Sequence, residues 1–214
     1  MNLSLTNADV VRCTELSVLR ADLSRDRVEA ICRGAMENGF AALTVPSSLV
    51  AECAARLEDS DVSLIAQIGF PHGLMHSDAK RFETELGGDD GAQEFEVVAN
   101  LMYLLNGDEG RFLRELRDIV DAAEGRHVRV ALKWSALSDA QRERGALAVL
   151  DSGAHYLSTG PGFGEKPDDE KLIAQFQNWI GDKFWIKAAQ PAGEEAALVC
   201  LKAGAIRVGR VASF

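Results

Sequence analysis

Gln93-Glu94-Phe95-Glu96-Val97-Val98-Ala99-Asn100 and His127-Val128-Arg129-Val130-Ala131-Leu132-Lys133-Trp134 are two stretches in which polar and apolar residues alternate. Successive side chains of a β-strand point to opposite faces, so each stretch predicts a strand with one polar and one apolar face. Glu96 lies on the polar face of the first stretch, and Arg129 and Lys133 lie on that of the second. In a closed parallel barrel, such side chains at the carboxyl ends of strands line the mouth of an active site.

Outward from these two stretches, strand and helix patterns alternate along the whole chain. We expect strands near residues 15–19, 40–45, 62–68, 94–100, 128–134, 154–158, 184–188 and 205–209. We expect the main helices at 24–38, with Ser24 as N-cap, 48–57, 77–86, with Ser77 as N-cap, 109–123, 138–150, 168–180 and 193–203. Alternation of this kind is typical of parallel βαβ units. It predicts an α/β fold, a minimal (β/α)8 TIM barrel forming a single domain over residues 1–214; a doubly wound open sheet is the alternative.

The composition of the chain limits the kinds of molecule that it is expected to bind and the cellular compartment in which it is expected to occur. The chain has 214 residues, of which 47% are hydrophobic and 26% charged, and this suits one domain with a sizeable core. Its net charge of −10 argues against binding nucleic acid or an anionic membrane. No apolar run approaches the roughly 20 residues of a membrane span. Four scattered cysteines without CxxC spacing predict buried, reduced thiols, and with no signal peptide in view we expect a cytoplasmic protein.

Several segments resemble the deoxyribose-phosphate aldolase family. Ile68-Gly69-Phe70-Pro71-His72-Gly73 matches the IGFPHG motif of that family in full. Further similar segments are Asn38–Val45, Lys80 with Phe82-Glu83 (family KxFE), Gly91–Val98, Asp151–Gly160, Ile186-Lys187-Ala188 and Arg207-Val208-Gly209. The resemblance extends from about Ser17 to Ala212, so it covers nearly the whole chain.

The resemblance implies a class I aldolase barrel, in which a lysine on the sixth strand forms an imine with an aldehyde. A second lysine, on the seventh strand, lowers the pKa of the first, and an aspartate on the fourth strand moves protons. The corresponding residues here are Ser158, Lys187 and Glu96. Serine cannot form an imine, so the resemblance also implies a divergent member that lacks the lysine of the sixth strand.

The loops that bind phosphate in the family differ here as well. Ala189-Gln190-Pro191 replaces the family's SGG, and the glycines of its last strand are largely replaced in Gly209–Ser213. Glycine lets backbone amides approach a phosphate closely, so phosphate recognition is left open, with Arg210 as one candidate for a compensating charge.

Two hypotheses follow for function. In the first, the protein is an aldolase-type carbon–carbon lyase acting on a small sugar or aldehyde, phosphorylated or not. Lys133 is then the displaced imine-forming nucleophile, with Lys187 and Glu96 as the other catalytic residues. The expected substrate-binding residues are Ser158, Asn100, Arg129, Gly160 and Arg210. In the second hypothesis, the barrel is a pseudo-aldolase that binds a small molecule without catalysis.

Simpler roles stay open for several of these side chains. Lys133 is equally well explained as an ion pair for Glu96, and Glu94 is expected to pair with Arg129 inside the barrel. His72 is expected to be a turn residue. The four histidines lack ligand spacing, so we predict no metal and no cofactor. A homodimer is an additional expectation.

Overall fold

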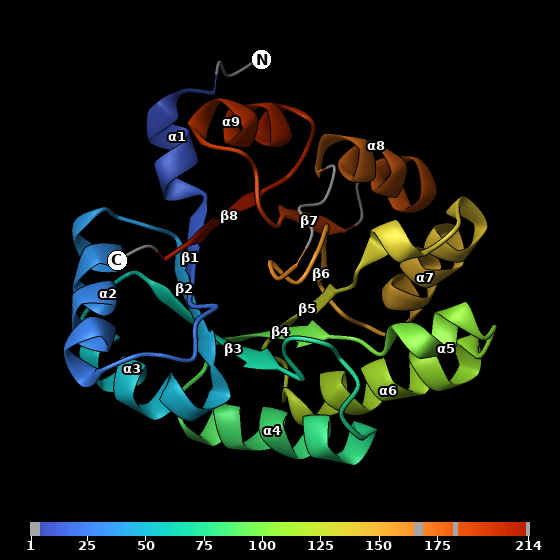
Figure 1. The fold of residues 1–214 in the computed structure, drawn as a ribbon, viewed down its shortest axis with the longest axis horizontal. Coiled ribbons are helices and arrows are strands. Elements are labelled where there is room, and N and C mark those ends of the chain that lie inside the picture. Colours follow the sequence, from blue (N-terminus) through green and yellow to red (C-terminus); the bar gives the residue numbers. More distant parts are fainter. Residues whose placement is uncertain (1–4, 165–168, 182–183, 213–214) are drawn as a thin grey trace.

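The computed structural model describes residues 5–164, 169–181 and 184–212. Eight parallel strands are hydrogen-bonded in the order β1 to β8, and β8 pairs with β1 to close the barrel. Figure 1 looks down this barrel and shows the helices arranged in a ring around it. The predicted TIM barrel is therefore confirmed, and the open sheet is excluded.

The elements follow one another as strand and helix. The strands are β1 (Thr14–Ser17), β2 (Ala42–Pro46), β3 (Ser63–Ile68), β4 (Glu94–Val98), β5 (His127–Ala131), β6 (Tyr156–Ser158), β7 (Trp185–Ala188) and β8 (Arg207–Val211). The α-helices of the described residues are α1 (Asn7–Arg12), α2 (Arg25–Glu37), α3 (Val50–Leu57), α4 (Ser77–Asp89), α5 (Leu101–Leu105), α6 (Glu109–Ala122), α7 (Asp139–Asp151), α8 (Asp169–Ile180) and α9 (Glu194–Lys202).

The N-cap of α2 is the predicted residue, whereas that of α4 is not. The Ser24 side chain accepts a hydrogen bond from the Arg27 amide at the start of α2, as predicted. At α4 the predicted cap, Ser77, is wrong: the N-cap is His76, whose ring accepts a hydrogen bond from the Asp78 amide. The predicted first residue of α8, Asp168, lies outside the described residues. The short helix α5 was not predicted.

The end of β5 differs from the prediction in a way that affects the site. The strand ends at Ala131, and the chain turns into a 3-10 helix at Trp134–Ala136. The Trp134 ring is buried, contacts Phe176 edge-on, and donates from Nε1 to the Ser158 carbonyl at 2.8 Å. This bond requires Trp134 to face β6, so the chain leaves the sheet before Lys133.

The strand register separates an apolar outer layer from a polar bore. Phe95, Val97 and Val130 are fully buried between the sheet and the helices. Their neighbours Glu94, Glu96 and Arg129 point inward, as the alternation predicts. The hydrophobic core therefore lies between the strands and the surrounding helices, and the charged residues lie inside the barrel.

No described helix is both long and apolar enough to cross a membrane. All four cysteines are free thiols, as predicted. Cys32, Cys53 and Cys200 are buried, whereas Cys13 is partly exposed, so the predicted burial is wrong for Cys13.

Candidate active site in the barrel bore

A buried lysine and two carboxylates meet inside the bore. Lys187, on β7, donates from Nζ to a Glu96 oxygen at 2.6 Å and lies 3.0 Å from a Glu15 oxygen. Glu96 comes from β4 and Glu15 from β1. Lys187 is only 2% exposed. The predicted residues Lys187 and Glu96 are therefore brought together, and Glu15 joins them.

Arg129 holds the carboxylates in place from β5. Its guanidinium donates two hydrogen bonds to Glu15, at 2.7 and 2.6 Å, and one to Glu96 at 3.0 Å. It also lies 3.5 Å from Glu94, which confirms the predicted pair inside the barrel. Arg207, on β8, lies 3.6 Å from Glu15 and 3.7 Å from Glu94. The ion pairs thus span the bore from β1 through β4, β5 and β7 to β8.

The charges of this network decide the ionisation of Glu15. Burial alone would raise the pKa of this carboxyl, but Arg129, Lys187 and Arg207 together lower it to about 2. For Arg129, burial lowers the pKa, and Glu15, Glu96 and Glu94 more than compensate, so that its pKa is raised. Opposite charges at hydrogen-bond distance favour the charged forms. Glu15 and Arg129 are therefore both charged at neutral pH.

Ser158 ends β6 beside the lysine. It is the register partner of Lys187 on the neighbouring strand, so the two side chains share the inner face. Its Oγ donates to the Gly160 carbonyl at 2.7 Å. With the Trp134 bond to its own carbonyl, Ser158 is held on both sides. It therefore borders the Lys187 amine and tethers the following loop.

The segment Gly160–Gly164 reaches over the mouth. The Phe163 ring lies edge-on to Phe70 and His72, with centroids 5.7 and 5.9 Å apart, so it contacts the loop that follows β3. The Gln190 amide, after β7, donates to the Gly162 carbonyl. Figure 1 shows this segment, in orange, extending toward the centre of the barrel. The loop thus joins the loop after β3 to the loop after β7 at the mouth.

Lys133 lies apart from the buried cluster. It is exposed, and it lines a mainly apolar cavity of about 370 Å³ at the mouth with His72, Met102 and Phe163. The ion pairs described for Glu96 are with Arg129 and Lys187. The expectation that Lys133 would point into the bore beside Glu96 fails because β5 ends two residues earlier.

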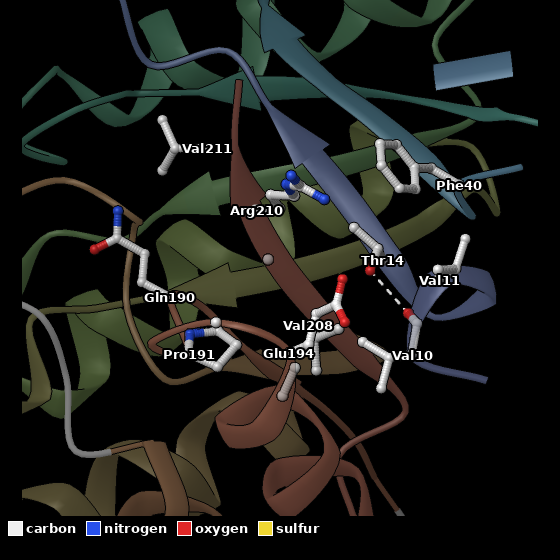
Figure 2. A pocket seen from close by; sticks show the side chains of 13 residues that line it. Val10, Val11, Thr14, Phe40, Gln190, Pro191, Glu194, Val208, Arg210 and Val211 are labelled. Carbon is white, nitrogen blue, oxygen red and sulfur yellow. Dashed lines mark hydrogen bonds between the residues drawn. The ribbon is translucent and has the colours of Figure 1, made fainter. Parts of the chain in front are cut away.

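Two further predicted binding residues have other roles. The Asn100 side chain accepts a hydrogen bond from the Met102 amide at 3.1 Å and caps α5. Arg210 is exposed, lies on the outer face of β8, and its guanidinium lies over the Phe40 ring at 5.9 Å. Figure 2 shows it lining an outer cavity of about 340 Å³ between β1, β8 and α9. Its position outside the wall corrects the suggestion that Arg210 supplies a charge at the mouth.

The family-like motif after β3 serves as a framework for the mouth. Lys80 is buried and donates to the Val98 carbonyl at 2.9 Å and to Glu115 at 2.8 Å. Burial lowers the pKa of Lys80, and Glu115 partly compensates. Glu83 accepts from the Gly69 amide at 2.8 Å. These residues fix the loops after β3 and β4 and do not enter the bore.

Comparison with known proteins agrees with this architecture, although no family model matches the chain. It is 31% identical over 209 residues to the deoxyribose-phosphate aldolase of Caldicellulosiruptor saccharolyticus, covering 96% of this chain and 95% of the relative. It is 31% identical over 202 residues to deoxyribose-phosphate aldolase 1 of Bacillus licheniformis, covering 94% and 91%. This chain belongs to the deoxyribose-phosphate aldolase family.

Solved structures show the same fold at lower identity. The tetrameric deoxyribose-phosphate aldolase of Aeropyrum pernix superposes with a TM-score of 0.88 at 22% identity, covering 96% of this chain and 88% of that one. An aldolase described as QR15 superposes with a TM-score of 0.87 at 23% identity, covering 94% and 90%. Membership of the deoxyribose-phosphate aldolase family supports an aldolase-type lyase as the class of activity.

Sequence reasoning missed Glu15. A signal for it was present, because Glu15 is an acidic residue in the short strand pattern that begins the chain. The parity argument applied to β4 and β5 would have placed it on the polar inner face.

Proposed function

We propose that this protein is an aldolase-type carbon–carbon lyase that forms an imine between Lys187 and a small sugar or aldehyde, phosphorylated or not. The observation that carries the proposal is the buried Lys187 amine, 2.6 Å from Glu96 and next to Ser158 on the inner face. A lysine of this kind needs a base to become neutral before it can attack a carbonyl. Glu96 is within proton-transfer distance.

The proposed reaction has three stages, which are imine formation, carbon–carbon bond cleavage and release of the second product. Glu96 takes a proton from the Lys187 ammonium, and the neutral amine adds to the carbonyl carbon to give a carbinolamine. Glu96 then returns the proton to the carbinolamine hydroxyl, and water leaves to give a protonated imine. A carboxylate then removes the proton of the substrate's β-hydroxyl, and the carbon–carbon bond breaks. Its electron pair moves into the imine to give an enamine, and an aldehyde leaves. Protonation of the enamine carbon and addition of water release the second carbonyl product and restore Lys187.

The geometry favours Lys187 over Lys133 as the nucleophile. Lys133 was the candidate from sequence, but it lies in an exposed position on the turn after β5. Desolvation is one of the main means by which a protein makes a lysine reactive, and Lys187 is the more buried of the two. In this proposal Lys133 contributes to the entrance, where its charge attracts an anionic substrate.

Borohydride trapping tests the proposal. Wild-type protein is incubated with small aldehydes and ketones, reduced with borohydride, digested, and analysed by mass spectrometry to find the modified lysine. We expect an adduct on Lys187, lost in Lys187→Met and retained in Lys133→Met. Lys202→Met is the matched control, because Lys202 is exposed on α9 outside the barrel.

The contrary outcomes are distinct. An adduct that is lost in Lys133→Met and retained in Lys187→Met would transfer the nucleophile to Lys133. Absence of an adduct with every carbonyl tested, together with binding of one of them, would replace the lyase with a non-catalytic binding barrel.

A further inference from the structure

The inner face of β2 and β3 carries neutral polar residues. Thr44, on β2, is the register partner of Ser17, and Gln67, on β3, is the register partner of Glu96. Register partners on adjacent parallel strands point to the same face, so Gln67 shares the inner face with Glu96. We name Thr44 and Gln67 the neutral side of the bore. The charged side consists of Glu15, Glu94, Glu96, Arg129, Lys187 and Arg207.

The neutral side lacks hydrogen-bond partners. The Thr44 hydroxyl and both polar atoms of the Gln67 amide have no partner within the described chain. Thr44 is 0% exposed and Gln67 is 2% exposed. Buried polar groups in native proteins are nearly always satisfied, and the exceptions require an explanation. Two adjacent strands leaving three such atoms in the bore of an enzyme indicate groups that are completed by a ligand.

The chemistry of these atoms specifies the ligand. An amide and a hydroxyl together offer both donors and acceptors, and a hydroxyl group on a ligand can satisfy both kinds. A phosphate would use only the donors and would lie close to the Glu96 carboxylate. An alkyl chain would leave all three atoms unsatisfied, at a cost in binding. The arrangement therefore suits a neutral, hydroxylated carbon chain.

We infer that Thr44 and Gln67 bind hydroxyl groups of the substrate and make the enzyme selective for hydroxylated carbonyl compounds over their deoxy analogues. This inference rests on the proposed imine chemistry of Lys187 for the position of the carbonyl. The substrate then extends across the bore, with its carbonyl carbon at β7 and its hydroxyl-bearing carbons at β2 and β3.

Selectivity and stability together test the inference. The rate of borohydride-trapped adduct formation is measured for glyceraldehyde and for propanal in wild type, Gln67→Leu and Thr44→Val. We expect the wild type to prefer glyceraldehyde, and each substitution to reduce that preference roughly 10–100-fold. We expect the melting temperature of both variants to stay level or rise, because an unsatisfied buried polar group is removed.

Thr84→Val is the matched control. Thr84 is also a fully buried threonine, but its hydroxyl donates to the Lys80 carbonyl at 2.9 Å. This substitution should lower the melting temperature and leave the preference between the two aldehydes unchanged. If Gln67→Leu and Thr44→Val behave like Thr84→Val in both measurements, the residues are structural and the inference is overturned.

A second readout is independent of imine chemistry. Erythritol has hydroxyls but no carbonyl, so its effect on the melting temperature reports binding alone. We expect a smaller increase in Gln67→Leu than in wild type or Thr84→Val, beyond the general polyol effect that all three share. Failure of every aldehyde to form an adduct, with this difference intact, would reject the proposed chemistry and keep hydroxyl recognition. Equal increases in all three proteins would reject the hydroxyl site.

Discussion

The charged side and the neutral side of the bore differ in whether their residues have partners within the chain. Each residue of the charged side forms at least one ion pair, although Glu94 Oε2, Arg129 Nε and Arg207 Nη1 lack a hydrogen bond to the described residues. On the charged side, Glu15, Glu96, Arg129 and Lys187 meet one another at 2.6–3.0 Å across four strands. On the neutral side, Thr44 and Gln67 point into the same bore without a hydrogen-bond partner among the described residues. Both sides are almost fully buried, so exposure does not explain the difference.

The difference suits the two roles that we propose for the two sides of the bore. Ion pairs that have formed before a ligand arrives are preorganised, and they can stabilise developing charge without rearrangement. Buried polar groups without hydrogen bonds lower the stability of the empty protein, and a ligand that forms those hydrogen bonds removes this free-energy penalty. The two proposals therefore assign chemistry to the charged side and recognition to the neutral side, and the following predictions test that division.

The largest expected effect is on the chemical step, in Glu96→Gln. An amide cannot take the proton from Lys187, so the rate of borohydride-trapped adduct formation should fall about 10²–10⁴-fold, while the preference for glyceraldehyde over propanal should persist. Single-turnover kinetics with both aldehydes measure this. A collapse of the preference together with the rate would remove the division between the two sides.

Arg129→Met should give the next largest effect, on stability. It leaves Glu15, Glu94 and Glu96 buried without their main partner, and loss of one partner of a buried ion pair costs about 3–5 kcal/mol. Urea unfolding of wild type and variant measures the loss. An effect below about 1 kcal/mol would show that the network is not preorganised.

Acid should weaken the charged side through Glu15. Its pKa is about 2 in the folded protein and 4.5 ordinarily, so its ionised form stabilises the fold above pH 4.5. That contribution, about 3 kcal/mol, is lost as the pH falls from 4.5 towards 2. In Glu15→Gln the decline in stability over this window should be smaller. Equal slopes in wild type and variant would contradict the ionisation assigned to Glu15.

The smallest effect is expected for Lys133→Met. Lys133 is exposed at the rim, and substitutions at such positions usually change stability by no more than about 0.5 kcal/mol. The imine adduct should persist. A large loss of stability, measured in the same urea titration, would mean that the charged side extends to the rim.

The fold was predictable because strand alternation and helix periodicity extend along the whole chain. The inward faces of Glu96, Arg129 and Lys187 followed from the same alternation. Lys133 was misplaced because that parity holds only while the strand continues, and the buried Trp134 ring ends β5 early. Tertiary packing of one large side chain overrode a local pattern.

Gln67 and Thr44 escaped prediction for a different reason. A lack of hydrogen-bond partners is a property of the surroundings in space, and no pattern along the chain reports it. Arg210 shows the same limit, because the outward face it takes on β8 depends on the register of the closed barrel. Sequence reasoning located the strands of the site but not the partners across it.

The ion pairs joining Arg129 to β1 and β4 also close the bore from below. Arg129 is 1% exposed, and it lies under the Lys187 amine between acids from opposite parts of the wall. Ion pairs therefore occupy the bore below Lys187, on the side away from the mouth. On the proposed mechanism, the aldehyde released by bond cleavage departs through the mouth before water frees the fragment still joined to Lys187. Such an ordered release would give the product-inhibition pattern of an ordered mechanism in steady-state kinetics.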